Sequence, residues 1–469
     1  MKTPGGAGTS TDPRGQLSPE GLLRGLGRWD VTFLTIGSVV GTGIFITTAD
    51  IARVLPHAGL ILAVWIVGGL LTLAGALTYG ELGAMFPRAG GQYNFLKEAY
   101  GPLWGFLFGW AAFFVINTGG IAALAVGFGE YLGSFVPFFS TTNILLRVPL
   151  GAWTWQVSGG QLAGAAAIIF LSAVNYVGLK EGAWVQNIVT IVKVGSIVGL
   201  AGVGLAVAAP VEPSLAAPLP AGNVLAAFGV GMIAVLWSFD GWYGLTASAG
   251  EIRDPARSLP WGLILGTLAV TILYVLMNVV YLRAMPVGAM PETSRIGETA
   301  AGILFGSVGA RLVSLAVIVS TFGCISSTIL WASRIYLPMA QDGLFFRSLA
   351  RVHPRHLTPG ASIAAQGAWA VALTLSGTYE QLYTYVVFAA TASHAATGFA
   401  VFVLRRTRPD APRPYRTWGY PWVPAAFIIA SLVLVANTLT EKPVESLIGV
   451  GLVALGLPAF AWWRRQSVP

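Results

Sequence analysis

Residues 35–46 read TIGSVVGTGIFI, and this stretch decides the fold. Gly41 and Gly43 flank Thr42 near the middle of an apolar segment that runs from about residue 31 to 54, counting about 1.5 Å per helical residue. Each glycine costs about 1 kcal/mol relative to alanine inside a helix. Taken alone, the pair has a second explanation, because glycines also let neighbouring membrane helices pack closely. The stretch is either a packing surface or a break in a helix.

The composition places this segment in a membrane. Of the 469 residues 55% are hydrophobic and only 10% are charged, too few to cover a soluble protein of this size. A helix needs about 20 apolar residues to cross the hydrocarbon layer, and about twelve segments qualify. They lie near residues 31–54, 60–86, 102–136, 161–179, 183–208, 222–250, 260–282, 310–338, 361–377, 381–404, 421–438 and 446–463.

The basic residues predict the orientation of these spans. Six of the 27 Lys and Arg residues fall in the segments that follow odd-numbered spans, namely Arg53, Arg147, Arg283, Arg295, Arg311 and Lys442. Lys193 lies within a span, and all the others fall on the side that holds the N-terminus. Because basic residues accumulate on the inner side, we expect both termini in the cytoplasm and no nucleic-acid partner. We expect the inner (plasma) membrane of a bacterium as the location.

A second interrupted span favours a break over a packing surface. Residues 237–244, in the middle of the sixth span, read WSFDGWYG. This span runs in the opposite direction to the first, and two opposed interrupted helices are typical of inverted-repeat transporters. Unwound backbone at this depth is tolerated only where it lines a cavity. The two breaks therefore predict one shared site.

The ends of broken helices determine what such a site binds. The half-helix that starts near Ile44 directs free N–H groups and the positive end of its dipole toward an anion, such as a carboxylate. The half-helix that ends near Trp237 and Ser238 leaves carbonyls that accept hydrogen bonds from an ammonium group. A small zwitterion satisfies both ends, whereas a phosphate would satisfy only the first.

The chain also carries a series of short motifs. They lie at residues 37–45, 79–83 (YGELG), 90–93 (GGQY), 238–242, 251–260 (EIRDPARSLP), 274–278 (YVLMN) and 353–359 (HPRHLTP). In this order they resemble the motifs of the amino acid–polyamine–organocation superfamily, and its bacterial L-type amino acid transporters match best. The resemblance extends from about residue 28 to 404 and is weaker beyond.

The resemblance implies an all-α membrane protein of about twelve transmembrane helices, a five-plus-five inverted repeat with broken first and sixth helices. Residues 28–208 would form the first repeat and residues 222–404 the second, before two peripheral helices and a short cytoplasmic C-terminus within residues 405–469. Residues 1–27 are rich in Gly, Pro and Ser and lack the apolar core of a signal peptide, so we expect a disordered cytoplasmic tail.

The resemblance also implies roles for residues at the breaks. The amides of Gly41, Thr42, Gly43 and Ile44 would hold the substrate carboxylate. Backbone carbonyls of Ile36, Trp237, Ser238 and Asp240 would surround the amine. Trp237 would act as an aromatic gate, unless it serves only helix packing. Asp240 would attract a cationic substrate or bind a proton, or cap a half-helix that begins at Gly241.

Lys193 is the most informative ionisable residue, because a cation at this depth needs a partner or a function. Relatives that use sodium hold the ion near this position, so the resemblance implies that the Lys193 ammonium replaces it beside Val39 and Val40. Alternatively Lys193 snorkels to the surface or titrates. The resemblance places Tyr274, Ser320 and Cys324 nearby, although a thiol is a weak partner and Cys324 has a second reading as a small buried residue.

We therefore expect sodium-independent transport of neutral L-amino acids by alternating access, with exchange implied by the resemblance alone. Proton-coupled symport and carriage of cationic amino acids or polyamines are alternatives, and a non-transporting amino acid sensor is an alternative of another class. With 4 His and no Ser/His/Asp or metal-ligand spacing, we expect no enzyme, cofactor or metal.

Partners are expected to be few. Animal L-type relatives attach to a heavy chain through a cysteine between the third and fourth spans, and this chain has none between residues 137 and 160. Its single cysteine, Cys324, lies in an apolar run. We expect a chain that works alone, as a monomer, and contacts only lipid and its amino acid substrate.

Overall fold

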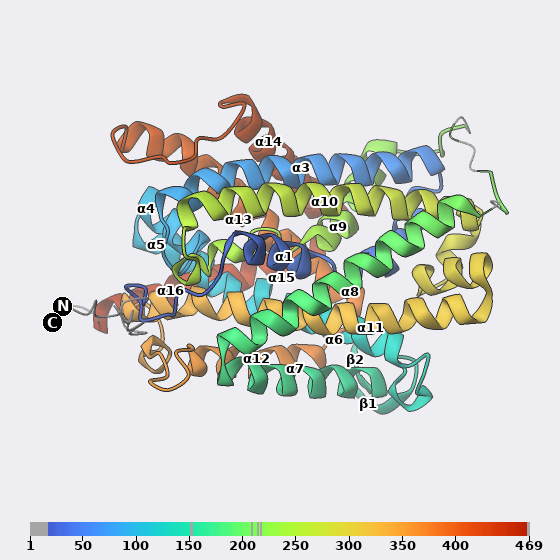
Figure 1. Cartoon of the computed structure of the whole chain (residues 1–469), viewed down its shortest axis with the longest axis horizontal. Coiled ribbons are helices and arrows are strands. Elements are labelled where there is room, and N and C mark those ends of the chain that lie inside the picture. The colour runs from blue at the N-terminus through green and yellow to red at the C-terminus, as the bar shows by residue number, and fades with distance from the viewer. Residues whose placement is uncertain (1–16, 151–152, 208–209, 213–214, 216–217, 467–469) are drawn as a thin grey trace, which may run out of the picture.

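The computed structural model describes residues 17–150, 153–207, 210–212, 215 and 218–466. Long helices that run roughly along one common axis make up most of it, as Figure 1 shows. Residues 17–27 and the last helix lie at one end of this bundle, which we call the terminal end. A β-hairpin lies at the opposite end, which we call the hairpin end.

The first half of the chain contains most of the helices that surround the first break. Its elements are α1 (Arg28–Val39), α2 (Gly43–Val54), α3 (Ala58–Met85), α4 (Gln92–Tyr100), α5 (Pro102–Ala111), the π-helical turn η2 (Ala112–Ile116), α6 (Asn117–Leu132), the 3₁₀ turn η3 (Pro137–Phe139), β1 (Ile144–Leu150), β2 (Trp153–Ser158), α7 (Gly159–Val177) and α8 (Leu179–Ala206). Strands β1 and β2 pair antiparallel, with Arg147 opposite Gln156. The sequence analysis did not predict this hairpin.

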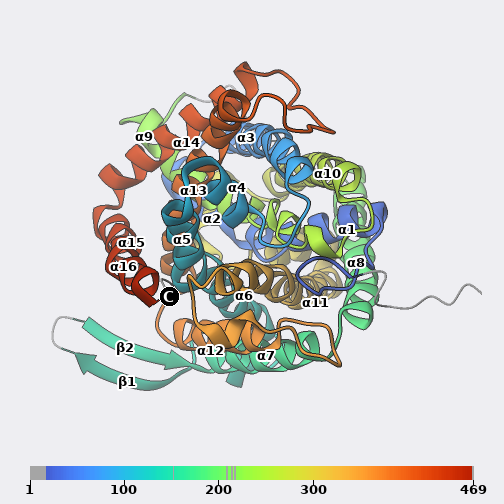
Figure 2. The same ribbon diagram turned by 90° about the vertical axis from the view of Figure 1, so that its left-hand side faces the viewer.

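The second half begins with the second broken helix. Its elements are α9 (Val224–Phe239), the 3₁₀ helices η4 (Gly244–Thr246) and η5 (Ala249–Glu251), α10 (Pro255–Ala284), η6 (Val287–Glu292), α11 (Ile296–Gln341), η7 (Arg347–Ala350), α12 (Gly360–Thr374), α13 (Tyr379–Thr407), α14 (Trp422–Glu441), α15 (Pro443–Ala454) and α16 (Gly456–Gln466). Figure 2 shows α14, α15 and α16 along the outer edge of the bundle. The division into two repeats remains a prediction.

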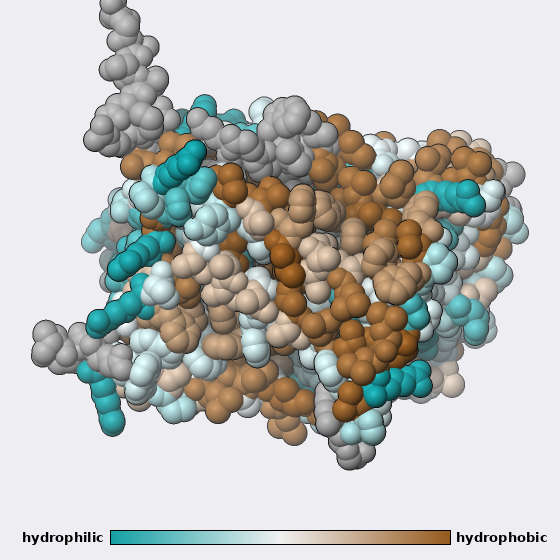
Figure 3. All heavy atoms as spheres, turned by 90° about the horizontal axis from the view of Figure 1, so that it is seen from below, coloured by the Kyte–Doolittle hydropathy of each residue, from teal (hydrophilic) through white to brown (hydrophobic). Residues whose placement is uncertain are grey.

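The predicted spans coincide with helices. In the described part of the chain, nine helices are long and apolar enough to cross a membrane, and the bent pair α1–α2 makes a tenth. The other two predicted spans correspond to the shorter helices α9 and α12, of 16 and 15 residues. Figure 3 shows a brown apolar belt between hydrophilic side chains at the two ends of the bundle. The predicted all-α membrane class is confirmed.

The first span is broken where the sequence predicts it. Helix α1 ends at Val39 and α2 begins at Gly43, and the two helices are bent by 41° relative to each other. Val40 between them has φ −75° and ψ 88°, outside the helical region. The last carbonyls of α1 therefore lose their helical partners at membrane depth.

The sixth span is broken after Phe239, but its second part differs from the prediction. Asp240 is extended, with φ −57° and ψ 151°, and Gly241 has φ +93°, a conformation that favours glycine. Turns and the 3₁₀ helices η4 and η5 follow. The prediction of a half-helix that begins at Gly241 with Asp240 as its cap is wrong, because the left-handed Gly241 cannot open an α-helix.

The prediction of a disordered tail for residues 1–27 is wrong for residues 17–27, while residues 1–16 lie outside the described residues. The amides of Gly25 and Leu26 donate to the Glu251 carbonyl at 2.9 and 3.0 Å. The side chains of Leu22 and Leu26 are buried. These hydrogen bonds and apolar contacts hold the segment across the terminal end of the bundle.

A buried ion pair closes the same end. Arg334 of α11 donates to Glu251 through Nε at 3.0 Å and Nη2 at 2.8 Å. The two side chains are 1% and 0% exposed. Removing one member of such a pair strands a charge in a site without water. The pair therefore fixes the end of α11 to the segment that precedes α10.

Replacing Glu251 with Gln should lower the melting temperature of the purified protein, because Arg334 loses its counter-charge; breaking a buried pair costs roughly 3–5 kcal/mol. The matched control is Glu98→Gln in α4, since its partners Arg88 and Arg408 are 39% and 45% exposed and pairs of this kind contribute roughly 0–1 kcal/mol. Intrinsic fluorescence during heating in detergent measures both. Equal shifts for the two variants would show that the buried pair does not stabilise this end.

Candidate substrate-binding site

The unwound end of α1 receives a cation from another helix. Lys193 of α8 is 1% exposed, and its Nζ donates to the carbonyls of Gly37 at 2.7 Å and Val40 at 3.0 Å. A third carbonyl, that of Ser320 in α11, lies at 3.4 Å. The ammonium group therefore joins α1, α8 and α11 through backbone oxygens and does not snorkel to the surface.

Two side chains of α11 complete the partners of this segment. Ser320 Oγ donates to the Val40 carbonyl at 2.9 Å. The thiol of Cys324 donates to the Ser38 carbonyl at 2.9 Å rather than contacting Lys193 by a hydrogen bond. Cys324 is thus both a small buried residue and a donor to the break.

Tyr274 of α10 bridges the two breaks. Its hydroxyl lies 3.1 Å from the carbonyl of Val39 and 3.1 Å from that of Ser238. The hydroxyl has one proton to share between these two carbonyls. Movement of either broken helix would therefore change the hydrogen bonds of Tyr274. Tyr274 is fully buried against Trp65 and Phe239.

The backbones of the two breaks are in direct contact. A Cβ added to Gly43 would lie 2.6 Å from Ser238 Cα, and one added to Gly241 would lie 2.8 Å from the Ser38 carbonyl oxygen. Glycine is needed at both positions because real Cβ atoms do not approach so closely. The predicted neighbourhood of the two interrupted helices is therefore observed.

The N-terminus of α2 presents donors toward this junction. Within the described chain, the amides of Thr42, Gly43 and Ile44 have no hydrogen-bond acceptor. The amide of Gly41, predicted to be free, donates to the Val39 carbonyl at 2.8 Å. Three free N–H groups at the positive end of a helix dipole form a binding place for a carboxylate.

Three of the four carbonyls predicted to bind an amine already have donors in this conformation, and the fourth, that of Asp240, has none among the described residues. The Ile36 carbonyl accepts from the Val40 amide at 2.9 Å, and the Trp237 carbonyl accepts from the Asp240 amide at 3.0 Å. The Ser238 carbonyl faces Tyr274. Each carbonyl oxygen has a second lone pair, so an ammonium group is an additional rather than an exclusive partner.

A small cavity of about 20 Å³ lies at the junction of the breaks. Its lining comes from α1, α2, α6, α9 and α11 and includes Asn117, Gly120, Trp237, Asp240 and Trp331. The Gly241 amide and the Tyr243 hydroxyl lie near the Asp240 carboxylate. The space suffices for about one water molecule, so the site is closed in this structure.

The side of this cavity that faces the hairpin end is closed by aromatic side chains. We call Trp237, Tyr379 and Tyr383 the aromatic wall. The Trp237 indole Nε1 donates to Tyr379 Oη at 2.7 Å, and Tyr379 Oη lies 2.9 Å from Thr42 Oγ1. Trp237 also stacks on Tyr383, with ring centroids 5.9 Å apart and an interplanar angle of 18°. Sequence reasoning missed both tyrosines. Their spacing of four residues at the start of a span, which places them on one helix face, was the available signal.

A pair of opposed, interrupted membrane helices with backbone donors and acceptors at their junction defines a class of protein. This arrangement belongs to membrane transporters that bind their substrate at the middle of the bilayer between two moving parts. Comparison with known proteins identifies the group within that class.

The chain belongs to the amino acid permease family, whose sequence profile matches residues 26–454. The serine/threonine exchanger SteT of Bacillus subtilis (strain 168) is 30% identical over 458 residues, which are 95% of this chain and 98% of that protein. The human b(0,+)-type amino acid transporter 1 is 31% identical over 468 residues, covering 96% and 90%. The human large neutral amino acids transporter small subunit 2 is 27% identical over 475 residues, covering 99% and 86%.

Gly43→Ala should weaken binding at the junction, because the added methyl group forces Ser238 and the two breaks apart. Overpacking of this kind costs about 1–3 kcal/mol, so substrate affinity should fall by about 5- to 150-fold. Gly199→Ala in α8 is the control, since a Cβ there meets no atom within 4 Å. Equilibrium binding of radiolabelled L-serine measures both variants. Unchanged affinity in Gly43→Ala would place the substrate elsewhere.

Proposed function

We propose that this protein exchanges neutral L-amino acids across the plasma membrane by alternating access and without sodium. The observation that carries the proposal is the ammonium of Lys193 among the carbonyls of Gly37, Val40 and Ser320. Backbone carbonyls of this kind are the ligands that a sodium ion would need. A covalently attached cation that already occupies them removes the need for a transported ion.

The amino acid would bind through its backbone groups. Its carboxylate would face the free amides of Thr42, Gly43 and Ile44, and its ammonium would face the carbonyl end of α9 near Ser238. Neither contact involves the substrate side chain. The walls around Asn117 and Gly120 would therefore select the side chain by shape and polarity. The names of the relatives, which include a serine/threonine exchanger and a large neutral amino acid transporter, support a neutral side chain.

Alternating access needs two barriers, and the protein has one on each side of the site. Trp237, Tyr379 and Thr42 close the hairpin end. Glu251, Arg334 and residues 17–27 close the terminal end. We place the terminal end in the cytoplasm, because most basic residues outside the spans lie there.

A second candidate function rests on Asp240. Its carboxylate lines the cavity, and among the described residues it has no ion-pair partner. A negative charge in this place would attract a cationic amino acid or accept a proton during transport. Cationic substrates and proton coupling are therefore the alternatives to test against neutral exchange.

A disulfide-linked heavy chain forms no part of the proposal. The chain has one cysteine, and Cys324 is buried among α1, α6 and α11. Its thiol donates a hydrogen bond to the Ser38 carbonyl. We propose that the chain transports without a covalently attached partner, and that it is a carrier rather than an enzyme or a sensor.

Proteoliposomes test the function directly. Vesicles preloaded with unlabelled L-serine should take up labelled L-serine equally well in sodium and in choline buffers, and empty vesicles should take up little. Preloading with L-arginine instead of L-serine, and imposing a pH gradient, test the two alternatives. Binding without any uptake would indicate a sensor, and uptake that requires sodium would contradict the role of Lys193.

Lys193→Met should reduce exchange at least about tenfold, because the carbonyls of Gly37 and Val40 lose charge-assisted hydrogen bonds in a site without water. The control is Ser196→Ala, one turn away on α8 at a partly exposed position. Initial exchange rates, normalised to the amount of reconstituted protein, measure the effect. Exchange by Lys193→Met at the rate of the control would remove the proposed role.

A further inference from the structure

A large cavity lies between the aromatic wall and the hairpin end of the bundle. Its volume is about 520 Å³, within the range of small-molecule sites. Tyr379 lines this cavity and bonds Trp237, which lines the small cavity at the junction of the breaks. One pair of side chains thus separates the two spaces. We call the large cavity the vestibule.

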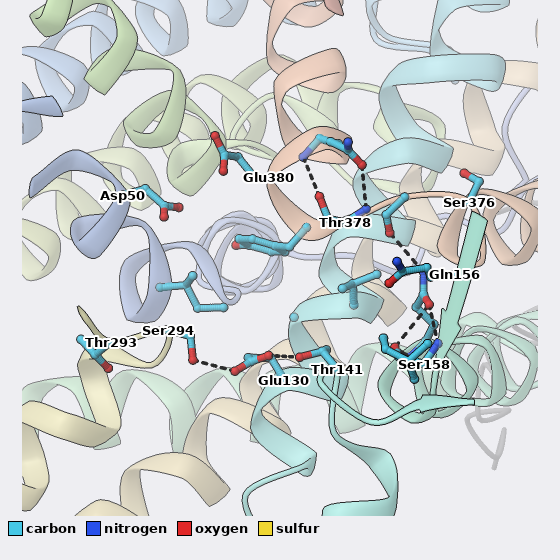
Figure 4. A pocket seen from close by; sticks show the side chains of 18 of the residues that line it. Asp50, Glu130, Thr141, Gln156, Ser158, Thr293, Ser294, Ser376, Thr378 and Glu380 are labelled. Carbon is cyan, nitrogen blue, oxygen red and sulfur yellow. Dashed lines mark hydrogen bonds between the residues drawn. The ribbon is translucent and has the colours of Figure 1, made fainter. Parts of the chain in front are cut away.

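We propose that the vestibule is a second binding site, which holds an amino acid zwitterion before it passes the aromatic wall. The proposal rests on the proposed function and adds a site to it. The vestibule is built from α2, α6, α13, the hairpin and the segment before α11. Figure 4 shows polar side chains around this space on several sides.

The charges of the vestibule complement a zwitterion. Asp50 of α2 and Glu380 of α13 lie close together on one side, as Figure 4 shows. Arg53 pairs with Asp50 and donates to the Pro291 carbonyl at 3.2 Å. A guanidinium has five N–H donors, so Arg53 retains capacity for a carboxylate. The two carboxylates would hold the ammonium of the same ligand, with Arg53 on its carboxylate.

The third carboxylate of the vestibule has a structural role. Glu130 accepts hydrogen bonds from Ser294 at 2.8 Å and from Thr141, and it pairs with Arg295 at 3.4 Å. Figure 4 shows Ser294, Glu130 and Thr141 in one row. Glu130 thus has three side-chain partners. Among the described residues Asp50 has two, Arg53 and Tyr383, and Glu380 has one, Lys442 at 3.5 Å, so we assign the ammonium to Asp50 and Glu380.

The remaining wall is neutral and combines apolar side chains, those of Ile46, Val126 and Ile144, with polar ones. Its polar groups include Thr154, Gln156 and Ser158 of the hairpin and Ser376. Hydroxyl and amide groups accept hydrogen bonds from small polar side chains without selecting a charge. The wall therefore suits the neutral substrates of the proposed function.

A ligand in the vestibule would act on the aromatic wall. Tyr383 Oη donates to Asp50 Oδ2 at 3.3 Å, and the Tyr383 ring stacks on Trp237. An ammonium group at Asp50 competes with Tyr383 for the same carboxylate. Binding in the vestibule would thus weaken a contact that holds Trp237 in its closed position.

Cysteine protection tests the vestibule in the full-length protein. Ser376→Cys introduces an exposed thiol on the lining, while the native Cys324 is 2% exposed. L-serine should slow the reaction of this thiol with a charged maleimide. Adding Gly43→Ala, which weakens binding at the inner site, should leave that protection unchanged. Adding Asp50→Asn or Arg53→Gln should raise the L-serine concentration for half protection at least about tenfold.

Glu212→Gln is the matched control, because Glu212 is an exposed acid of the same end and outside the vestibule lining. It should leave protection unchanged. Two results would overturn the vestibule site. One is loss of the protection by L-serine when Gly43→Ala is added, and the other is an equal change of protection by Asp50→Asn and Glu212→Gln. Should Gly43→Ala not fold, saturation binding of labelled L-serine replaces it. Two molecules per chain in Ser376→Cys, one of them bound at least about tenfold more weakly when Asp50→Asn is added, support the site, and one molecule per chain in Ser376→Cys overturns it.

The two proposals fail separately. Exchange of L-serine without any protection of the Ser376→Cys thiol would overturn the vestibule site and leave the proposed function intact. Protection without exchange in proteoliposomes would overturn the proposed function and leave the vestibule site in place. Glu380→Gln supplies an independent variant, because the Glu380 carboxylate pairs with Lys442 at 3.5 Å and, unlike that of Asp50, has no hydrogen bond to Tyr383 among the described residues.

Discussion

The carbonyl groups at the end of α1 must find hydrogen bonds in a place that water does not reach, and the rest of the structure depends on how they do so. In hydrocarbon an unpaired peptide group costs several kcal/mol. Here Lys193, Ser320, Cys324 and Tyr274 supply the donors. A helix can therefore stay broken at this depth, and the free amides of α2 become available to a ligand.

These donors come from three different helices, α8, α10 and α11, all of which pack against α1. The break is thus held by tertiary contacts and not by its own sequence. Any tilt of α1 must change the distances from Lys193 and Tyr274 to its carbonyls. We propose that a ligand at the junction acts on the surrounding helices through these contacts, as alternating access requires.

Glycine makes the junction compact. Gly43 packs directly against Ser238, and Gly241 packs against the Ser38 carbonyl. The two unwound backbones therefore meet without intervening side chains. Around this contact the protein is closed on both sides, by an aromatic wall toward the hairpin end and by the Arg334–Glu251 pair toward the terminal end. The two barriers differ in physical type, since one consists of stacked rings and the other of opposite charges.

The amino acid sequence by itself determined the membrane class, the approximate spans and the two breaks, because these follow from apolar length and from Gly and Asp inside apolar runs. Local pattern also singled out Lys193. Only the tertiary structure decided that Gly25 and Leu26 pair with Glu251, that 3₁₀ turns follow Gly241, and that Tyr379 meets Thr42. Each of these features joins residues far apart in the chain or depends on the space that neighbouring helices leave, and neither property is encoded in a local pattern of residues.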